Sequence, residues 1–279
     1  MKITMTATIA ALAFVLSPLT AVQASPADDV KAFQGYFAKK FKDTKFDDYV
    51  NGIYAIDPAS RKQWEEIEDF PPYELAVEDG EAMWNKPFAN GKTYKDCFGD
   101  EVGNIRAKYP FYDEKADTIR TIEGDINKCR TDNGEKPLGW KKGKIAALSA
   151  YIAFEGRGKP ISIKMPSTEK ELAWYNKGKT FFYAKRGQLN MACADCHVYN
   201  SGRSIRADKL SPALGHPSHF PVYRSKWGSL GTLHRRYAGC NKNIRAKPFK
   251  AQSDEYKALE YFQVVMSSGL KWNGPGARK

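Results

Sequence analysis

The sequence predicts a mainly α-helical protein built from two domains. Apolar residues recur at helical spacing along the chain, as in amphipathic helices that pack on a core. The chain has 279 residues, more than one domain usually needs, and 42% of them are hydrophobic. A stretch rich in glycine and proline, Gly156 to Pro166, separates two groups of helical segments. We therefore place a domain boundary near residue 160.

Residues 1–24 have the features of a secretory signal peptide. Lys2 precedes an apolar run from Ile9 to Leu16, and the small-residue site Val22-Gln-Ala24 follows it. The run is far shorter than the roughly 20 apolar residues of a membrane-spanning helix. No other segment is long enough. We expect cleavage near Ala24, export to a bacterial-type periplasm and no membrane span.

The first domain, residues 25–160, shows helical spacing in several segments. They are Val30 to Phe37, Pro58 to Trp64, Tyr73 to Trp84, Ile119 to Cys129 and Lys144 to Phe154. In the second domain, residues 161–279, Thr168 and Glu171 give the signal of a capping box ahead of a helix that reaches Phe182. Ser253 to Met266 predicts a last helix, and irregular basic loops fill the space between.

The segment Met191-Ala-Cys-Ala-Asp-Cys-His197 carries the C-x-x-C-H pattern of covalent haem attachment. Cys193 and Cys196 form two thioethers to the porphyrin, and His197 supplies an axial ligand to the iron. A thioredoxin-type motif would follow a strand, and a zinc site needs a second ligand pair at ordinary spacing. Helix, haem loop, basic loops and helix is the order of a cytochrome c domain. We predict one covalent haem c in the C-terminal domain.

The second axial ligand is open from these patterns alone. Met191 lies too close to the haem motif, and Met266 falls in the last helix, where a core role is more typical. The remaining candidates are His216, His219, His234 and Cys240.

Cys240 differs from the histidines because it is an odd cysteine in an exported chain. Five cysteines are present; the haem motif takes two, and Cys97 can pair with Cys129. Cys240 ends the run His234-Arg-Arg-Tyr-Ala-Gly-Cys240, and neighbouring cations favour a thiolate. If this run is helical, Arg236 lies one turn before the sulfur and can bind an oxyanion such as thiosulfate. A buried, inert cysteine is the alternative.

Positive charge is concentrated in the second domain. Between Ser201 and Lys250 there are eleven Lys and Arg residues and one acidic residue, Asp208, whereas the whole chain has a net charge of +12. Such a surface attracts anions. No nucleic-acid-binding motif occurs, so we expect no nucleic-acid partner. A small anion or an acidic protein is the preferred ligand, with a solvated basic face as the alternative.

The sequence resembles the SoxA subunits of the SoxAX cytochrome complexes of thiosulfate oxidation. The resemblance runs over nearly the whole mature chain. It is carried by Gly80-Glu-Ala-Met-Trp84, Tyr109-Pro-Phe-Tyr112, Ala192-Cys-Ala-Asp-Cys-His197 and His234-Arg-Arg-Tyr-Ala-Gly-Cys240.

The resemblance implies that Cys240 ligates the haem iron and carries a persulfide, and that Arg236 lines the substrate channel. It implies an L-cysteine S-thiosulfotransferase that joins thiosulfate oxidatively to a cysteine of the carrier protein SoxYZ, in a heterodimer with SoxX. Some members have a second C-x-x-C-H in the N-terminal domain, and this chain has none. The resemblance therefore implies a single-haem type with an N-terminal cytochrome c-like domain that holds a disulfide, Cys97 to Cys129, in place of haem.

Two other functions stay open at this point. A plain periplasmic electron-transfer cytochrome would use Cys240 or a histidine only as a ligand. A non-catalytic haem subunit would use its basic surface to dock an acidic protein.

Overall fold

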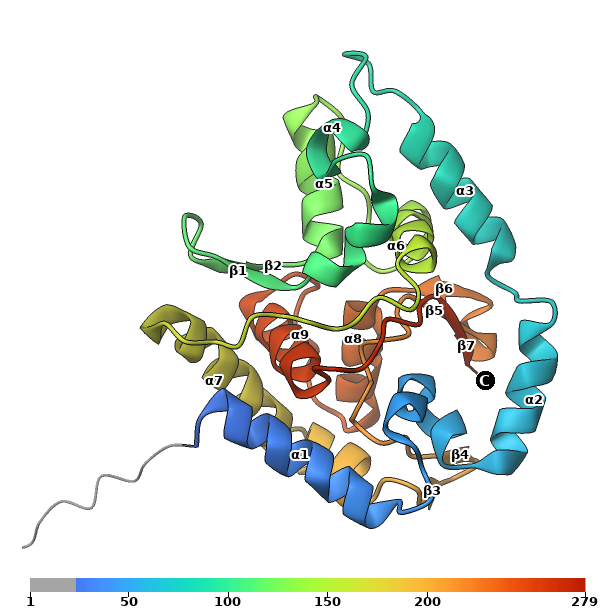
Figure 1. Cartoon of the computed structure of the whole chain (residues 1–279), viewed down its shortest axis with the longest axis vertical. Helices are drawn as coiled ribbons and strands as arrows, with labels where there is room; N and C mark the ends of the chain where they lie inside the picture. Colours follow the sequence, from blue (N-terminus) through green and yellow to red (C-terminus); the bar gives the residue numbers. More distant parts are fainter. Residues whose placement is uncertain (1–23, 279) are drawn as a thin grey trace, which may run out of the picture.

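The computed structural model describes residues 24–278, and helices dominate this part of the chain (Figure 1). The predicted signal peptide lies outside the described residues except for Ala24. Among the residues described, none of the helices has the length and apolar character to cross a bilayer.

The helices and strands follow one another in two groups. The first group is α1 (Pro26–Lys40), the 3-10 helix η1 (Phe46–Ala55), α2 (Pro58–Glu68), α3 (Glu74–Asn85), α4 (Lys95–Phe98), η2 (Val102–Asn104), η3 (Arg106–Lys108), β1 (Phe111–Asp113), β2 (Thr118–Arg120), α5 (Ile122–Asp132) and α6 (Lys144–Glu155). The second is α7 (Glu169–Tyr183), the π-helix η4 (Asp195–Tyr199), β3 (Ser204–Ile205), β4 (Asp208–Lys209), β5 (Val222–Arg224), η5 (Ser225–Trp227), β6 (Ser229–Gly231), α8 (Leu233–Asn243), α9 (Asp254–Met266) and β7 (Gly276–Arg278).

The predicted helices are present, and the boundary of one of them is different. The capping box at Thr168 and Glu171 opens α7 as predicted. Ile119, predicted as helical, belongs to β2 instead, because the Thr121 side chain accepts a hydrogen bond from the Gly124 N–H and starts α5 after it. The basic loops contain short strands that the spacing of apolar residues did not reveal.

Helices α7 and α9 cross in direct backbone contact. A side chain at Gly178 would collide with the carbonyl oxygen of Ala258 and with Phe262. The absent Cβ lets the two helices approach, and Tyr175 and Phe262 pack beside the crossing with ring centroids 5.5 Å apart. This crossing forms the centre of the larger hydrophobic core.

The same arrangement occurs in the first half of the chain, where α3 crosses α6. A side chain at Gly80 would collide with the carbonyl oxygen of Ala147 and with Tyr151. Trp84 and Tyr94 stack next to this crossing, with ring centroids 5.4 Å apart. Both helix pairs therefore use glycine on one helix and alanine on the other at the point of contact.

Cys97 in α4 and Cys129 in α5 form the predicted disulfide. Cys97 lies 17 residues after Gly80. Cys193 and Cys196 lie 15 and 18 residues after Gly178. Counted from the glycine at each helix crossing, the disulfide cysteine Cys97 and the two cysteines of the predicted haem-attachment segment therefore lie at similar distances along the chain.

Helix α1 and η1 pack with the second half, although the sequence assigns residues 25–160 to the first domain. Phe33 and Phe37 are buried in the core that contains α7 and α9, and the rings of Phe33 and Phe182 lie 6.3 Å apart. Figure 1 shows α1 beside α7. Sequence spacing predicts the helix that carries Phe33 and Phe37 but does not identify the core that this helix covers.

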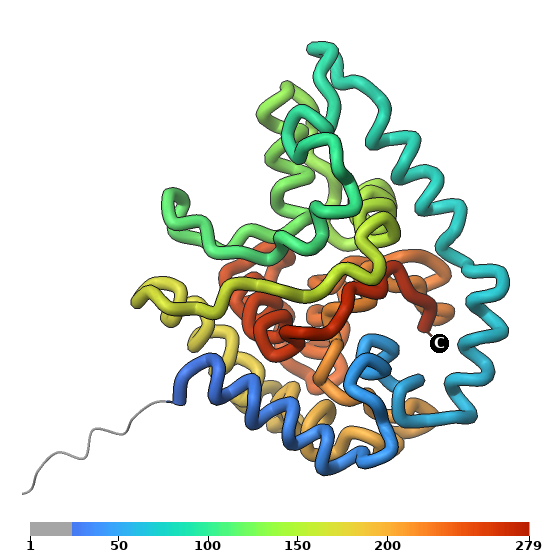
Figure 2. Tube along the Cα trace, in the orientation of Figure 1, coloured from blue at the N-terminus to red at the C-terminus, as the bar shows by residue number. Residues whose placement is uncertain are grey.

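The stretch from Gly156 to Pro166 is held in place by the C-terminal segment. The Ile161 N–H donates to the Leu270 carbonyl (2.6 Å), and the Trp272 N–H donates to the Lys159 carbonyl (2.9 Å). Figure 2 traces these two segments side by side. The C-terminus then adds β7 to β5, which also pairs with β6.

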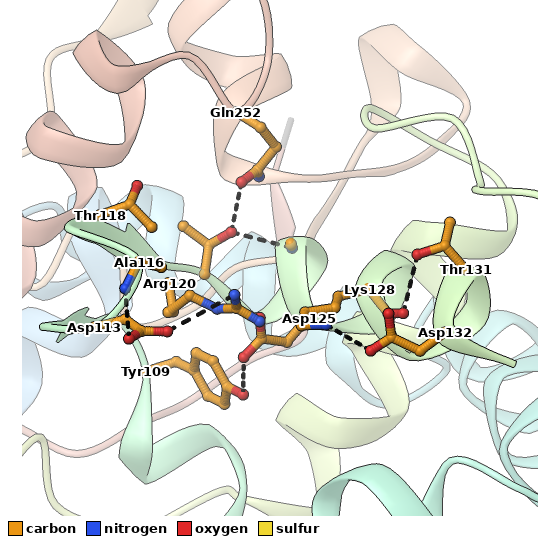
Figure 3. Close-up of polar contacts among 12 residues, drawn as sticks. Tyr109, Asp113, Ala116, Thr118, Arg120, Asp125, Lys128, Thr131, Asp132 and Gln252 are labelled. Atoms are coloured by element: carbon orange, nitrogen blue, oxygen red, sulfur yellow. Dashed lines mark hydrogen bonds and ion pairs between the residues drawn. The ribbon is translucent and has the colours of Figure 1, made fainter.

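Four ionisable side chains meet where the two groups of elements join. Arg106 lies over the Trp272 ring at 3.8 Å from its centroid, and Glu123 accepts a hydrogen bond from Ser149 (3.1 Å). His234 Nδ1 accepts from the Gln252 N–H (3.0 Å), which leaves the ring proton on Nε2, 3.1 Å from Glu260. Figure 3 shows Gln252 reaching toward β2 and α5, where its amide oxygen accepts from Thr121.

Within this cluster the Glu123 carboxyl group favours its neutral form. Burial raises the pKa of Glu123, and the neighbouring Glu260 raises it further, whereas Arg106 and His234 act in the opposite direction. The net effect is a pKa of Glu123 above its usual value.

We predict that Gly178→Ala destabilises the protein by about 1–3 kcal/mol, because the added methyl group overpacks the α7–α9 crossing. The midpoint of urea-induced unfolding measures this. Gly35→Ala is the matched control: this glycine lies in α1 with open space around its Cβ position. It should stabilise the protein by about 0.5–1 kcal/mol. Equal effects of the two changes would contradict the close contact.

We predict that Glu123→Gln weakens the pH dependence of stability. Folded Glu123 holds its proton more tightly than unfolded Glu123, so the free energy of unfolding falls as pH rises through the interval between the two pKa values. The amide carries no proton to lose, and its oxygen can still accept from Ser149. Unfolding measured from mildly acidic to mildly alkaline pH tests this, with exposed Glu78→Gln as control. An unchanged slope in the Glu123→Gln variant would argue against a raised pKa of Glu123 in the folded protein.

Candidate functional site

The haem-attachment segment is a short turn with a fixed histidine. The Ala192 N–H donates to the Asp195 carboxylate (2.7 Å) at the start of η4. His197 Nδ1 lies 2.9 Å from the carbonyl oxygen of Ser211, to which it donates. This bond fixes the ring and leaves Nε2 free to bind a metal ion.

Helix α8 brings the second part of the site. Thr232 caps its N-terminus, and its buried face holds Tyr237 and Asn241. The Asn241 side chain donates to the Tyr256 hydroxyl of α9 (3.2 Å), and Tyr237 donates to Gln263. These bonds fix the rotation of α8, and the rotation in turn fixes Cys240.

Cys240 lies next to His197, and the two side chains interact. Burial raises the pKa of the Cys240 thiol, but the Arg236 guanidinium, the His197 imidazole and Arg224 together lower it to about 7. Cys193 lies close by, and burial together with Cys240 raises the pKa of its thiol to about 12. The environment therefore favours thiolate at Cys240 and not at Cys193.

The two adjacent arginines of α8 have different surroundings. Arg235 stacks on Trp227, 4.1 Å from the ring centroid, and donates to Ser229 (3.2 Å) and to the Leu230 carbonyl (3.1 Å). Within residues 24–278, the half-buried Arg236 side chain makes no hydrogen bond or ion pair. Its guanidinium is therefore available to an anion near Cys240.

Arg224 on β5 also belongs to this site, and sequence reasoning missed it. Its guanidinium acts on Cys240, and burial with repulsion from Arg236 lowers its own pKa to about 10. It makes no ion pair within the described residues. The sequence marks Arg224 only as one of the basic residues between Ser201 and Lys250. Its position beside α8 depends on the fold, which brings β5 there, and not on its spacing from Cys240.

The other candidate ligands have different positions. His216 touches His197 edge-on, with ring centroids 4.3 Å apart, and bonds to Ser211 (2.8 Å). His219 is buried, and His234 belongs to the cluster with Glu260. Met266 is buried in the core. The structure thus places Cys240 next to both Cys196 and His197.

These residues fit a covalently bound haem. Cys193 and Cys196 are free cysteines, as is Cys240. His197 bonds to Ser211 through Nδ1, so Nε2 is the nitrogen that could bind iron, and the sulfur of Cys240 could supply a second donor. The residues that could hold the group are thus two cysteines for attachment, one imidazole and one further sulfur.

The helical scaffold and this motif define a c-type cytochrome. A family model described as "SoxA/TsdA, cytochrome c domain" matches residues 79–161. The chain is 57% identical to "L-cysteine S-thiosulfotransferase subunit SoxA" of Chlorobaculum tepidum, over 94% of both chains. It is 51% identical to the protein of the same name from Allochromatium vinosum, over 95% of this chain and 93% of that one.

Among solved structures, the crystal structure of SoxXA from P. pantotrophus matches with a TM-score of 0.71 and 31% identity. The match covers 78% of this chain and 84% of that one. The chain belongs to the SoxA family of L-cysteine S-thiosulfotransferase subunits. Its fold is the mainly helical, cytochrome c-like fold of that family.

Proposed function

We propose that this chain joins thiosulfate to a cysteine of a SoxYZ-type carrier protein, as the SoxA half of a SoxAX heterodimer. The reaction forms one sulfur–sulfur bond between the carrier thiol and thiosulfate and releases one proton and two electrons. The observation that carries the proposal is Cys240 beside His197, with the unpaired Arg236 one helical turn away. The names of the related proteins support it.

Arg236 binds the anion in this proposal. A guanidinium presents a planar fork of donors to the oxygens of the sulfonate end, and Arg224 adds positive charge. The outer sulfur of thiosulfate is then held toward Cys240.

Cys240 is the sulfur nucleophile, as thiolate or as the persulfide that the family resemblance implies. Its terminal sulfur bonds to the outer sulfur of thiosulfate, and the two electrons released would pass one at a time through the haem groups of the SoxAX heterodimer to an external electron acceptor. The carrier thiolate then attacks that outer sulfur, and Cys240 leaves as the thiolate, or as the persulfide anion if it began as persulfide, so the thiosulfate group passes to the carrier by exchange. Cys193, Cys196, His197 and Cys240 would hold one haem c per chain, which supplies one-electron redox chemistry when bound.

The proposal includes two cytochrome c-like lobes, of which only the second holds haem. The repeated crossings at Gly80 and Gly178 support it, and so does the disulfide at the corresponding place of the first lobe. The boundary stays near residue 160, with α1 and η1 covering the second lobe. The leader and the disulfide both suit an exported, periplasmic protein. The likeness to SoxXA supports a SoxX-type partner.

We predict that Cys240→Met gives a haem protein without coupling activity. The thioether can ligate iron but cannot act as a sulfur nucleophile. Paramagnetic resonance of the ferric protein should lose the low-spin thiolate signal, and thiosulfate-dependent coupling to the carrier should stop. A variant that keeps full coupling would show that Cys240 is not the sulfur nucleophile.

We predict that Arg236→Ala raises the KM for thiosulfate about ten- to a hundredfold, the cost of a charge-assisted hydrogen bond. Arg203→Ala is the control, because it removes the same charge from an exposed position of the basic segment. Coupling rates measured at a series of thiosulfate concentrations give the KM of the Arg236→Ala and Arg203→Ala variants. An equal response of both variants would mean that Arg236 contributes only general positive charge.

A further inference from the structure

A basic groove lies at the junction of the two halves of the chain, outside the site described above. Its volume is about 610 Å³. The groove combines the segment that precedes α6 with the segment that precedes α9. It is lined by Gly139, Trp140, Lys141, Lys142, Lys250 and Ala251.

The lysines of the groove have no counter-charge. Lys141, Lys142 and Lys250 are exposed, and none of them forms an ion pair within residues 24–278. Lys144 and Lys247 are the next charged residues along the two segments, and they are also basic and without ion pairs in the described part of the chain. The groove therefore carries positive charge from two directions, and this charge attracts anionic partners.

Trp140 gives the groove an apolar wall. Its side chain is half-buried, so part of the indole remains accessible. Tryptophan surrounded by cations is typical of the centre of a protein interface, where a partner side chain packs on the ring. The groove thus suits a chain that carries both carboxylates and an apolar residue.

Two hydrogen bonds connect the groove to α8, the helix that carries Cys240. The Thr232 hydroxyl donates to the Trp140 carbonyl (2.9 Å), and the Thr232 N–H donates to the Lys141 carbonyl (3.1 Å). Thr232 is also the N-cap of α8. The positive end of the helix dipole lies here, and Cys240 follows about 12 Å along the helix axis.

We infer that this groove docks an acidic segment of the carrier protein, an inference that rests on the proposed function. A partner held at Trp140 is placed within about two helical turns of the Cys240 sulfur. The partner carries acidic residues next to an apolar side chain.

The test is the triple variant Lys141→Glu, Lys142→Glu and Lys250→Glu in the haem-loaded SoxAX complex. We expect the KM for the carrier protein to rise at least about tenfold, because like charges now face each other. The KM for thiosulfate and the ferric spectrum should not change. Lys39→Glu, Lys42→Glu and Lys62→Glu form the matched control, since these exposed lysines lie in or next to α1 and in α2 and give the same change in net charge.

Trp140→Ala should weaken binding of the carrier without changing its salt dependence, because it removes only an apolar contact. Binding of the carrier to the complex, measured without thiosulfate, gives a second readout. If the parent complex binds the carrier through the groove but does not couple thiosulfate, the proposed function fails and the docking site stands. An unchanged carrier KM in the triple variant, or preferential binding of duplex DNA or anionic vesicles over the carrier, would overturn the inference.

Discussion

The backbone contact between α7 and α9 at Gly178 is the constraint on which the site depends. Because the helices touch there, α9 lies close enough to present Glu260 and Tyr256 to α8. The turn after α7 is tied to the end of α8 in the same way, because a side chain at Gly187 would collide with the Ile244 carbonyl. The crossing of α7 and α9 therefore positions both the start of the predicted haem-attachment segment and α8, the helix that carries Cys240.

The first half keeps the same type of crossing but builds its core from side chains and a cross-link. Trp84, Tyr94 and Ile126 fill the cluster beside the disulfide. A cytochrome lobe normally derives much of its core from the porphyrin, so a lobe without one needs another source of stability. Closing a loop of 32 residues gives roughly 3–4 kcal/mol in the chain-entropy model.

Sequence patterns predicted the helices because helical spacing and caps are local. Thr168 and Glu171 define the start of α7 without any knowledge of its neighbours. The short strands β5, β6 and β7 could not be found in this way, since each has three residues and β7 pairs with a distant segment. Phe33 and Phe37 predicted a helix but not its partner. For the site, Cys240 and Arg236 followed from one run of residues, whereas Arg224 reaches them only through tertiary packing.

The basic residues on and near α8 offer different sites to a small anion and to an acidic protein. A uniformly basic surface would not distinguish these two proposed partners. Arg235 is held away from this role, because its Nη1 donates to Ser229 and Leu230 and its guanidinium stacks on Trp227. Arg236 keeps its donors free one turn from the sulfur. A small dianion can approach this half-buried guanidinium more readily than the folded body of a protein can. A protein finds its counter-charges instead at the lysines of the basic groove, where the side chains are exposed. Both partners are attracted by the same field, and the difference in burial assigns each to its own end of the helix.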